Sequence, residues 1–256
     1  MSNIASIYPQ SPAPVRGTCT GCGLLLWCLP ANLSSREYAQ LDAVMEHRRF
    51  LKRDSALFLA GDTLDSLYIV NSGSVKTLIA DVEGRAQVTG FSMPGDLVGI
   101  EAIDSGRYPC DVITLEDSSC CGISYENLRR LSQNIPALQL HVHRMMSREI
   151  TRDYGLMFLL GSMGAEERIA QFVLTLSTRY AARGYSASQF RLCMSRNDIG
   201  SYLGLRLETV SRILGRLNNR DILEIIGRDI HLKNPDGLRQ ILCGFESRIS
   251  QRRITH

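Results

Sequence analysis

The sequence predicts an α+β chain in which a small β domain is followed by a long helix and a C-terminal winged helix-turn-helix. Three observations support this. Short strand-like runs separated by turn residues fill residues 50–124, helical periodicity begins after Pro136, and two short helices around a glycine turn precede a hairpin within residues 195–232. Strands at this spacing are typical of an antiparallel barrel or a double-sheet roll.

Length and composition exclude several classes of protein. The chain has 256 residues, of which 44% are hydrophobic and 21% charged, which is ordinary for a globular protein and excludes disordered and collagen-like chains. The first 17 residues lack a basic stretch followed by an apolar core, and no apolar run approaches the roughly 18 residues that a membrane span needs. We therefore expect a cytoplasmic protein with no membrane partner.

Charge and residue pattern divide the chain into four regions. Residues 1–150 hold 13 Lys and Arg against 16 Asp and Glu, a net charge of −3, whereas residues 151–256 hold 16 against 10, a net charge of +6. The C-terminal part is therefore the one suited to a polyanion. We expect an irregular arm at 1–33, the β domain at 34–133, the long helix at 134–162 and the DNA-binding domain at 163–250.

Within the β domain, strands are expected at 67–70, 75–80, 87–92 and 114–123, each run ending at turn residues or at a change of pattern. In the long helix, one set of residues steps by 4, 3, 4 and 3, which is the seam spacing of a coiled coil. The set is Met146, Ile150, Asp153, Met157 and Leu160. The spacing favours a homodimer, although a helix packed on its own β domain would show a similar stripe.

Asp153 is the exception in this apolar seam. In a parallel two-fold dimer it faces its own copy, so two carboxylates repel each other and dimerisation becomes marginal. The alternative is that Asp153 reaches solvent and matters little.

The segment from Ser195 to Leu232 predicts a helix-turn-helix. Ser195 followed by Asp198 resembles a capping box, Gly204 breaks the first helix, and a second helix is expected from Leu207 to about residue 218. Its buried stripe falls at i, i+3, i+4 and i+7, namely Val210, Ile213, Leu214 and Leu217. Two apolar runs at 222–226 and 230–232 around a glycine turn predict the wing.

Three polar residues lie on the opposite face of that second helix. Arg212 can donate two hydrogen bonds to guanine, Glu208 can accept from cytosine N4, and Ser211 can serve either base or contact a thymine methyl. The alternative is a solvated Glu–Arg pair at i, i+4. The expected phosphate contacts are Arg196, Arg206 and Arg216.

The cysteines suggest a soft-metal site. Cys19, Cys22 and Cys28 form a C-x2-C-x5-C pattern in the arm, and a tetrahedral metal or a four-iron cluster needs a fourth ligand. The candidates for it are Cys110, Cys120, Cys121, Cys193 and Cys243. Adjacent side chains on a strand point to opposite faces, so only one of Cys120 and Cys121 is expected to face the arm. Zinc, an iron–sulfur cluster and free redox thiols all remain open on spacing alone.

Several runs in order identify a family resemblance. They include Cys19-x2-Cys22-x5-Cys28-Leu29-Pro30, Gly95-Asp96-Leu97-Val98-Gly99, Ala165-Glu166-Glu167-Arg168, Ile199-Gly200-x-Tyr202-Leu203-Gly204 and Glu208-Thr209-x-Ser211-Arg212. From Cys19 to about Leu232 the chain resembles the FNR branch of the CRP/FNR superfamily of bacterial transcription regulators.

The resemblance implies a fold and a mechanism. The fold is a cyclic-nucleotide-binding-like β-roll, a dimerisation helix and a winged helix. The implied cofactor is a [4Fe-4S] cluster on Cys19, Cys22, Cys28 and Cys121, whose reaction with oxygen weakens the dimer and releases DNA. The implied partners are a palindromic double-stranded operator and RNA polymerase, at genes activated or repressed under anaerobiosis.

Departures from the cAMP-responsive branch refine the expectation. That branch binds the cyclic phosphate with an Arg-Ser pair, where this chain reads Arg107-Tyr108-Pro109-Cys110, so we expect no cAMP binding. Leu207 and Ser211 stand where that branch has Arg and Gly, which implies TTGAT-like half-sites in an inverted repeat.

Two alternatives remain open. One is a regulator of the same family that senses thiol oxidation or carries zinc. The other is an iron–sulfur or zinc enzyme, but the chain has only five His and lacks a nucleophile–base pair or a Gly-rich phosphate motif. We therefore expect no catalytic residues.

Overall fold

The computed structural model describes residues 19, 22, 28–30, 32–45 and 48–242, and it divides into two compact units, residues 1–151 and 152–256. Most of the expected arm, the end of the expected DNA-binding domain and Cys243 lie outside the described residues.

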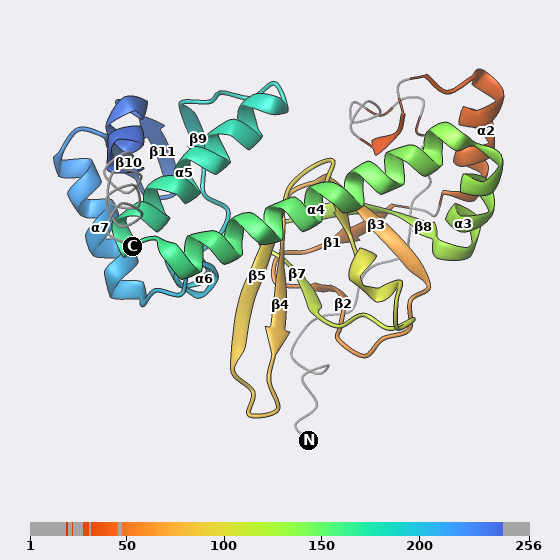
Figure 1. Ribbon diagram of the computed structural model, residues 1–256, viewed down its shortest axis with the longest axis horizontal. Helices are drawn as coiled ribbons and strands as arrows, with labels where there is room; N and C mark the ends of the chain where they lie inside the picture. Colours follow the sequence, from red (N-terminus) through yellow and green to blue (C-terminus); the bar gives the residue numbers. More distant parts are fainter. Residues whose placement is uncertain (1–18, 20–21, 23–27, 31, 46–47, 243–256) are drawn as a thin grey trace, which may run out of the picture. The chain divides into compact units, whose positions relative to one another are not determined.

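The first unit contains a roll of two antiparallel sheets, as the sequence predicts (Figure 1). One sheet has the order β1 (Arg49–Leu51), β8 (Ser118–Ser124), β3 (Ser66–Ser72), β6 (Leu97–Val98). The other has the order β2 (Ala56–Phe58), β7 (Asp111–Thr114), β4 (Val75–Ala80), β5 (Ala86–Ser92). A short 3-10 turn, η3 (Ile100–Ala102), follows β6.

The expected strand at 114–123 is confirmed from residue 118 to 123, but its expected beginning is wrong. β7 ends at Thr114 and β8 begins at Ser118 in the other sheet, so the chain crosses between sheets at 115–117. Polar contacts hold this crossing, because the Asp117 carboxylate accepts from the backbone N–H of Arg53 at 3.0 Å and the Ser118 hydroxyl donates to the carbonyl of Glu116 at 2.7 Å. Such bonds compete with a continuous strand.

Aromatic and aliphatic side chains fill the interior of the roll. The rings of Phe58 and Tyr108 stack with centroids 3.8 Å apart, and the Tyr108 hydroxyl donates to the carbonyl of Ser66. Tyr68, Val70 and Cys120 belong to the same buried cluster. Tyr108 thus occupies the interior with its own ring.

Helices cover the outer face of the first sheet. They are α2 (Ser35–Val44), α3 (Tyr125–Asn134) and the beginning of α4 (Pro136–Ser162). Leu67 and Ile69 alternate with the interior residues of β3 and join Leu41, Leu131 and Leu138 in an outer cluster. Leu29, which directly follows Cys28, is also part of this outer cluster.

Helix α4 continues through Gly155 and ends at Ser162. A glycine inside a helix costs about 1 kcal/mol relative to alanine but does not terminate it. The helical periodicity after Pro136 therefore forms one helix of 27 residues.

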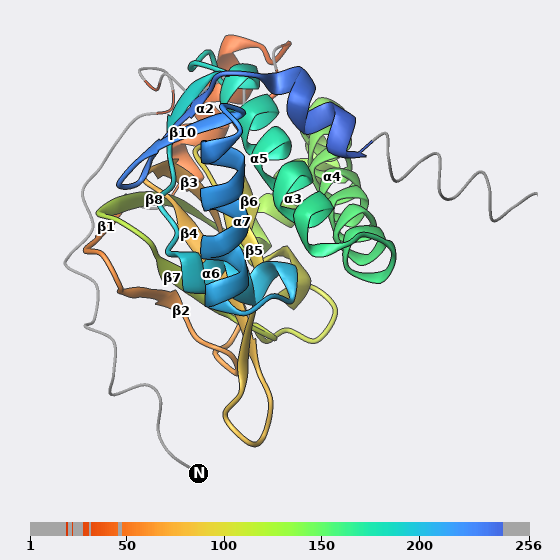
Figure 2. The same cartoon turned by 90° about the vertical axis from the view of Figure 1, so that its left-hand side faces the viewer.

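The second unit is a winged helix-turn-helix (Figure 2). After α5 (Ala165–Ala182), its elements are β9 (Gln189–Arg191), α6 (Arg196–Leu203), α7 (Leu207–Asn219), β10 (Leu223–Ile226) and β11 (Asp229–Leu232). The three strands form an antiparallel sheet in the order β10, β11, β9, which is the predicted wing with one added strand. The predicted stripe of α7 is confirmed, since Val210, Ile213, Leu214 and Leu217 are buried.

Candidate nucleic-acid interface and thiol site

A capping box starts the first helix of the helix-turn-helix. The Ser195 hydroxyl oxygen accepts from the backbone N–H of Asp198 at 3.1 Å, and the Asp198 carboxylate accepts from the backbone N–H of Ser195 at 2.9 Å. These reciprocal bonds satisfy donors that a helix start leaves open. The sequence signal for this helix start is therefore confirmed.

Two glycines shape the turn between α6 and α7. Gly204 has φ 63°, in the left-handed region that favours glycine, and ends α6. A Cβ at Gly200 would lie 2.6 Å from the carbonyl oxygen of Leu205, so the backbone after the turn passes directly over this residue. Both positions need glycine for the turn to close.

The three predicted base-reading residues share the face of α7 opposite its buried stripe. Glu208 and Arg212 are exposed and Ser211 is half-buried. Among the described residues, no ion pair joins Glu208 to Arg212, so the alternative of a solvated pair has no contact in the structure. Arg206 is the N-cap of α7 and makes no side-chain cap bond, which leaves backbone donors at the helix start suited to an anion.

The predicted phosphate-binding arginines differ in their surroundings. Arg206 is exposed, and Arg196 is half-buried at the first residue of α6. Arg216 is paired with Glu166 at 3.3 Å, and Arg220 is paired with the same carboxylate at 3.0 Å. Glu166 lies in the first turn of α5, so Arg216 also links α7 to α5.

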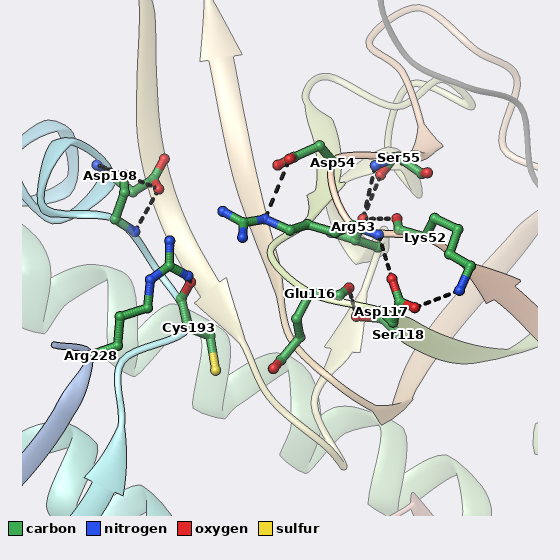
Figure 3. Close-up of polar contacts among 12 residues, drawn as sticks. Lys52, Arg53, Asp54, Ser55, Glu116, Asp117, Ser118, Cys193, Asp198 and Arg228 are labelled. Carbon is green, nitrogen blue, oxygen red and sulfur yellow. Dashed lines mark hydrogen bonds and ion pairs between the residues drawn. The ribbon is translucent and has the colours of Figure 1, made fainter.

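A further arginine connects the wing to the segment before α6. The Arg228 guanidinium donates to the carbonyl of Cys193 at 3.1 Å (Figure 3), and the backbone N–H of Leu192 donates to the carbonyl of Arg228 at 2.8 Å. The tip of the wing is thereby tied to the chain that leads into the helix-turn-helix. Arg228 lies in the glycine turn that was expected between the runs 222–226 and 230–232, and the sequence pattern gave no sign of this contact.

The predicted dimer seam on α4 carries apolar side chains that the single chain leaves exposed. Ile150 is 51% exposed and Met157 66%. Asp153 is exposed between them, and Met146 and Leu160 are half-buried. Exposed apolar residues at seam spacing are typical of a helix that packs against a partner.

Side chains alternate between the two faces of β8, and this places Cys120 and Cys121 on opposite sides of the sheet. Cys120 is fully buried in the interior of the roll, and Cys110 is 3% exposed in the same cluster. Cys121 lies on the other face of β8, where it pairs with Ile69 in register. Cys19 and Cys28 pack against the outer cluster that contains Ile69. Cys19, Cys28 and Cys121 therefore share one face of the sheet.

Burial and neighbouring thiols raise the pKa of three of the predicted ligands, Cys19, Cys28 and Cys121. Burial, followed by the thiols of Cys22, Cys121 and Cys19, raises the pKa of Cys28 to about 12. Burial and then a hydrogen bond with Asp42 raise the pKa of Cys19 to about 12. Burial also raises the pKa of Cys121, against the opposing effect of Arg48. A metal that binds these sulfurs must therefore displace their protons.

Within the described part of the chain, no three thiol, imidazole or carboxylate groups are arranged to hold a metal ion. The donor set itself is uniform, since all four predicted ligands are cysteines, the ligands that iron–sulfur clusters and zinc prefer.

A β-roll, a long helix and a winged helix-turn-helix together define a class of DNA-binding transcription regulators. The cyclic nucleotide-binding domain family matches residues 48–134, and the Crp-like helix-turn-helix domain family matches residues 167–241. The chain belongs to the CRP/FNR family, on its FNR branch, and is a regulator of transcription rather than an enzyme.

Two curated relatives support this assignment. The chain is 44% identical over 216 residues to the anaerobic regulatory protein of Pasteurella multocida, covering 84% of this chain and 79% of that protein. It is 43% identical over 223 residues to the fumarate and nitrate reduction regulatory protein of Escherichia coli, covering 87% of this chain and 89% of that protein.

Solved structures agree on the fold. FixK2 from Bradyrhizobium japonicum matches with a TM-score of 0.70 and 31% identity, over 76% of this chain and 96% of that chain. The c-di-GMP responsive regulator CLP from Xanthomonas campestris matches with a TM-score of 0.63 and 24% identity, over 78% of this chain and 99% of that chain. Among the described residues, no helix is both long and apolar enough to cross a membrane.

Proposed function

We propose that this chain is a cytoplasmic, oxygen-responsive transcription regulator whose four cysteines, Cys19, Cys22, Cys28 and Cys121, hold a [4Fe-4S] cluster. The observation that carries the proposal is that the arm thiols Cys19 and Cys28 pack on the outer face of the sheet to which Cys121 belongs, while Cys120 and Cys110 are buried in the roll. When bound, such a cluster supplies an oxygen-reactive iron centre.

The four predicted ligands come from two separate parts of the chain, so a metal centre that binds all four affects the fold. Three come from the arm and Cys121 comes from β8, so holding a common metal centre ties the arm to the sheet. Leu29 then sits in the outer cluster together with Leu138 and Met145 of α4. The arm and the beginning of the predicted dimer helix thus share one buried core.

The predicted seam of α4 links the contact between the arm and this helix to dimerisation. Exposed Ile150 and Met157 gain burial in a dimer, while two copies of Asp153 repel each other. Because these effects oppose each other, the monomer–dimer equilibrium is balanced closely enough for a modest contribution from the arm to shift it.

The dimer presents two reading helices to a TTGAT-like inverted repeat. We assign base contacts to Glu208, Ser211 and Arg212 and phosphate contacts to Arg196, Arg206 and Arg216. RNA polymerase is the expected further partner on DNA, as the family resemblance implies. Cyclic AMP is not a ligand, because Tyr108 and Phe58 stack in the interior of the roll and the Arg-Ser pair is missing.

Anaerobic purification tests the proposal. We expect iron and acid-labile sulfide in the protein, specific binding to a palindromic duplex under nitrogen, and loss of that binding after aeration. Cys121→Ala should abolish iron binding, whereas Cys193→Ala, a half-buried thiol of the second unit, should not. A colourless protein with zinc, or equal operator binding before and after air, contradicts the proposal.

A further inference from the structure

The amide of Asn71 donates a hydrogen bond to the sulfur of Cys22. The distance from Nδ2 to Sγ is 3.3 Å, and the two residues lie 49 positions apart in the chain. Asn71 belongs to β3, whereas Cys22 belongs to the arm, so this bond joins the sheet to one of the proposed cluster ligands.

A β-bulge gives Asn71 this position. On β3, Val70 pairs with Cys120 and Ser72 pairs with Ser119, so Asn71 is an extra residue without a partner in the register. A bulge re-aims the side chain of the extra residue, and bulges are common beside functional sites. Here the regular alternation of β3 is interrupted at the residue that reaches the arm.

A chain of hydroxyls fixes the amide. The hydroxyl of Ser119 donates a hydrogen bond of 3.1 Å to Oδ1 of Asn71. The hydroxyls of Ser72 and Ser119 are 2.7 Å apart, and because a serine has one proton to donate, Ser72 is the donor in that pair. The chain runs from Ser72 through Ser119 to Asn71, and it leaves the NH₂ group of Asn71 directed at the sulfur.

This orientation suits a sulfur that holds a metal. A cysteine bound to iron has lost its proton and can only accept a hydrogen bond. An amide turned the other way would direct Oδ1 at the sulfur, where two acceptors would repel each other. The hydrogen bond from the Ser119 hydroxyl to Oδ1 therefore favours the amide orientation in which the NH₂ group of Asn71 donates to a metal-bound Cys22.

We propose that Asn71 is a positioning residue for Cys22, which donates an N–H···S bond that slows the loss of the bound cluster to oxygen. The inference rests on the proposed function. Hydrogen bonds to sulfur tune the stability and potential of iron–sulfur centres, and removing such outer contacts typically costs about 10-fold or more in metal affinity or activity. Asn71 also keeps the arm next to the sheet, where Cys121 lies.

The test compares rates of cluster loss in anaerobically loaded full-length protein. Visible absorbance is followed after mixing with buffer of defined oxygen content, and the Fe–S stretching bands are recorded by resonance Raman spectroscopy. Asn71→Ala removes the donor, and Asn71→Asp keeps the shape but offers only acceptors. We expect both to lose the cluster about 10-fold faster than the wild type and to shift the Fe–S bands.

A double variant separates tuning from general damage to the fold. Ser119→Ala should accelerate loss by a smaller factor, and it should have no further effect when Asn71 is already alanine, because Ser119 acts through Asn71. Asn134→Ala is the matched control, since its amide donates one bond to the carbonyl of Arg130 on α3. It should leave both rate and spectrum unchanged.

The outcomes distinguish this inference from the proposed function. If the wild-type protein holds no iron, the proposed function fails and the inference with it. If the wild type holds the cluster but Asn71→Ala and Asn71→Asp lose it at the wild-type rate with unshifted bands, only the role of Asn71 is overturned. Additive effects of Ser119→Ala and Asn71→Ala would also contradict it.

Discussion

The guanidinium of Arg168 donates a hydrogen bond of 2.9 Å to the carbonyl oxygen of Leu203, the last residue of α6. The same side chain donates to the carbonyls of Leu160 at 2.7 Å and Met163 at 2.9 Å, where α4 ends. Helix C-termini leave carbonyls without partners and carry partial negative charge. One cation thus satisfies the ends of two helices, and the first helix of the helix-turn-helix is anchored to the end of α4.

Replacing Arg168 should therefore affect both stability and DNA binding. We expect Arg168→Ala to lower the free energy of unfolding by about 1.5–3 kcal/mol, because carbonyls lose a charged donor. Urea unfolding followed by circular dichroism and duplex binding measure the two effects. Arg239→Ala, which removes an exposed pair with Asp236, is the control and should change neither. Equal effects of the two variants would rule out this role for Arg168.

For Gly200 and Gly215, in the two helices of the helix-turn-helix, we predict stability changes of opposite sign. Gly200→Ala places a Cβ 2.6 Å from the carbonyl oxygen of Leu205 and should destabilise the protein by about 1–3 kcal/mol. Gly215→Ala meets nothing within 4 Å on α7 and should stabilise it by about 0.5–1 kcal/mol through helix propensity. Thermal unfolding of the apoprotein measures both, and a shift in the same direction would contradict the packing argument.

The second unit could be predicted closely because its signals are local. The Ser195–Asp198 capping box, the stripe of α7 and the glycine turns all act within a few residues, so spacing alone places α6, α7 and the wing. The crossing at 115–117 was missed for the opposite reason. Asp117 is held there by Arg53, a residue 64 positions away, and a single-sequence pattern does not contain that contact.

The candidate thiol site shows the same division. The spacing of Cys19, Cys22 and Cys28 and the opposite facing of Cys120 and Cys121 could be read from the sequence, and the family resemblance implied the choice of Cys121. The role of Asn71 could not, because it depends on a bulge in β3 and on a contact with a distant arm. Arg216 was expected at a phosphate, but whether it also pairs with Glu166 depends on how α5 packs against α7.

The contact between Lys52 and Asp117 predicts a pH dependence. The Asp117 carboxylate accepts from Nζ of Lys52 at 2.6 Å and from the backbone N–H of Arg53 (Figure 3). The bond from Lys52, followed by that from Arg53, lowers the pKa of Asp117. Folding therefore gains stability from this group above the ordinary aspartate pKa of about 3.9, and that gain is lost as the pH falls through the lowered pKa of the folded state.

Asp117→Asn should accordingly be less stable than the wild type near neutral pH and equally stable in acid below the folded-state pKa. Because both side chains are exposed, the difference should be small and should shrink with added salt. Urea midpoints of the apoprotein across pH measure it. Lys52→Met should remove most of the pH-dependent difference, and an unchanged difference in that background would assign it to another group.

Arg212 and Arg216 predict different losses in DNA binding. Arg212→Ala should weaken binding to the TTGAT-like duplex by about 1–3 kcal/mol. It should have almost no effect on binding to a second duplex in which the contacted base is changed. Arg216→Ala should weaken both duplexes alike and reduce the salt slope by about 1. Fluorescence anisotropy at several salt concentrations measures both. If Arg216→Ala lowers only the free energy of unfolding, its ion pair with Glu166 is its main role.

We predict that removing the Asp153 carboxylate gives a dimer that no longer depends on the arm. In Asp153→Ala the repulsion between two copies is removed while Ile150 and Met157 keep their apolar seam, so the aerobic protein should dimerise at least about tenfold more tightly, or 1.4 kcal/mol. Sedimentation equilibrium in air measures the dimer, and duplex binding should persist after aeration. Glu149→Ala, the other carboxylate of α4, lies off the seam and should remain monomeric in air. If the Asp153→Ala protein is monomeric in air and fails to bind its operator, carboxylate repulsion does not set the monomer–dimer equilibrium. In that case the apolar seam alone is too weak to hold the two helices together.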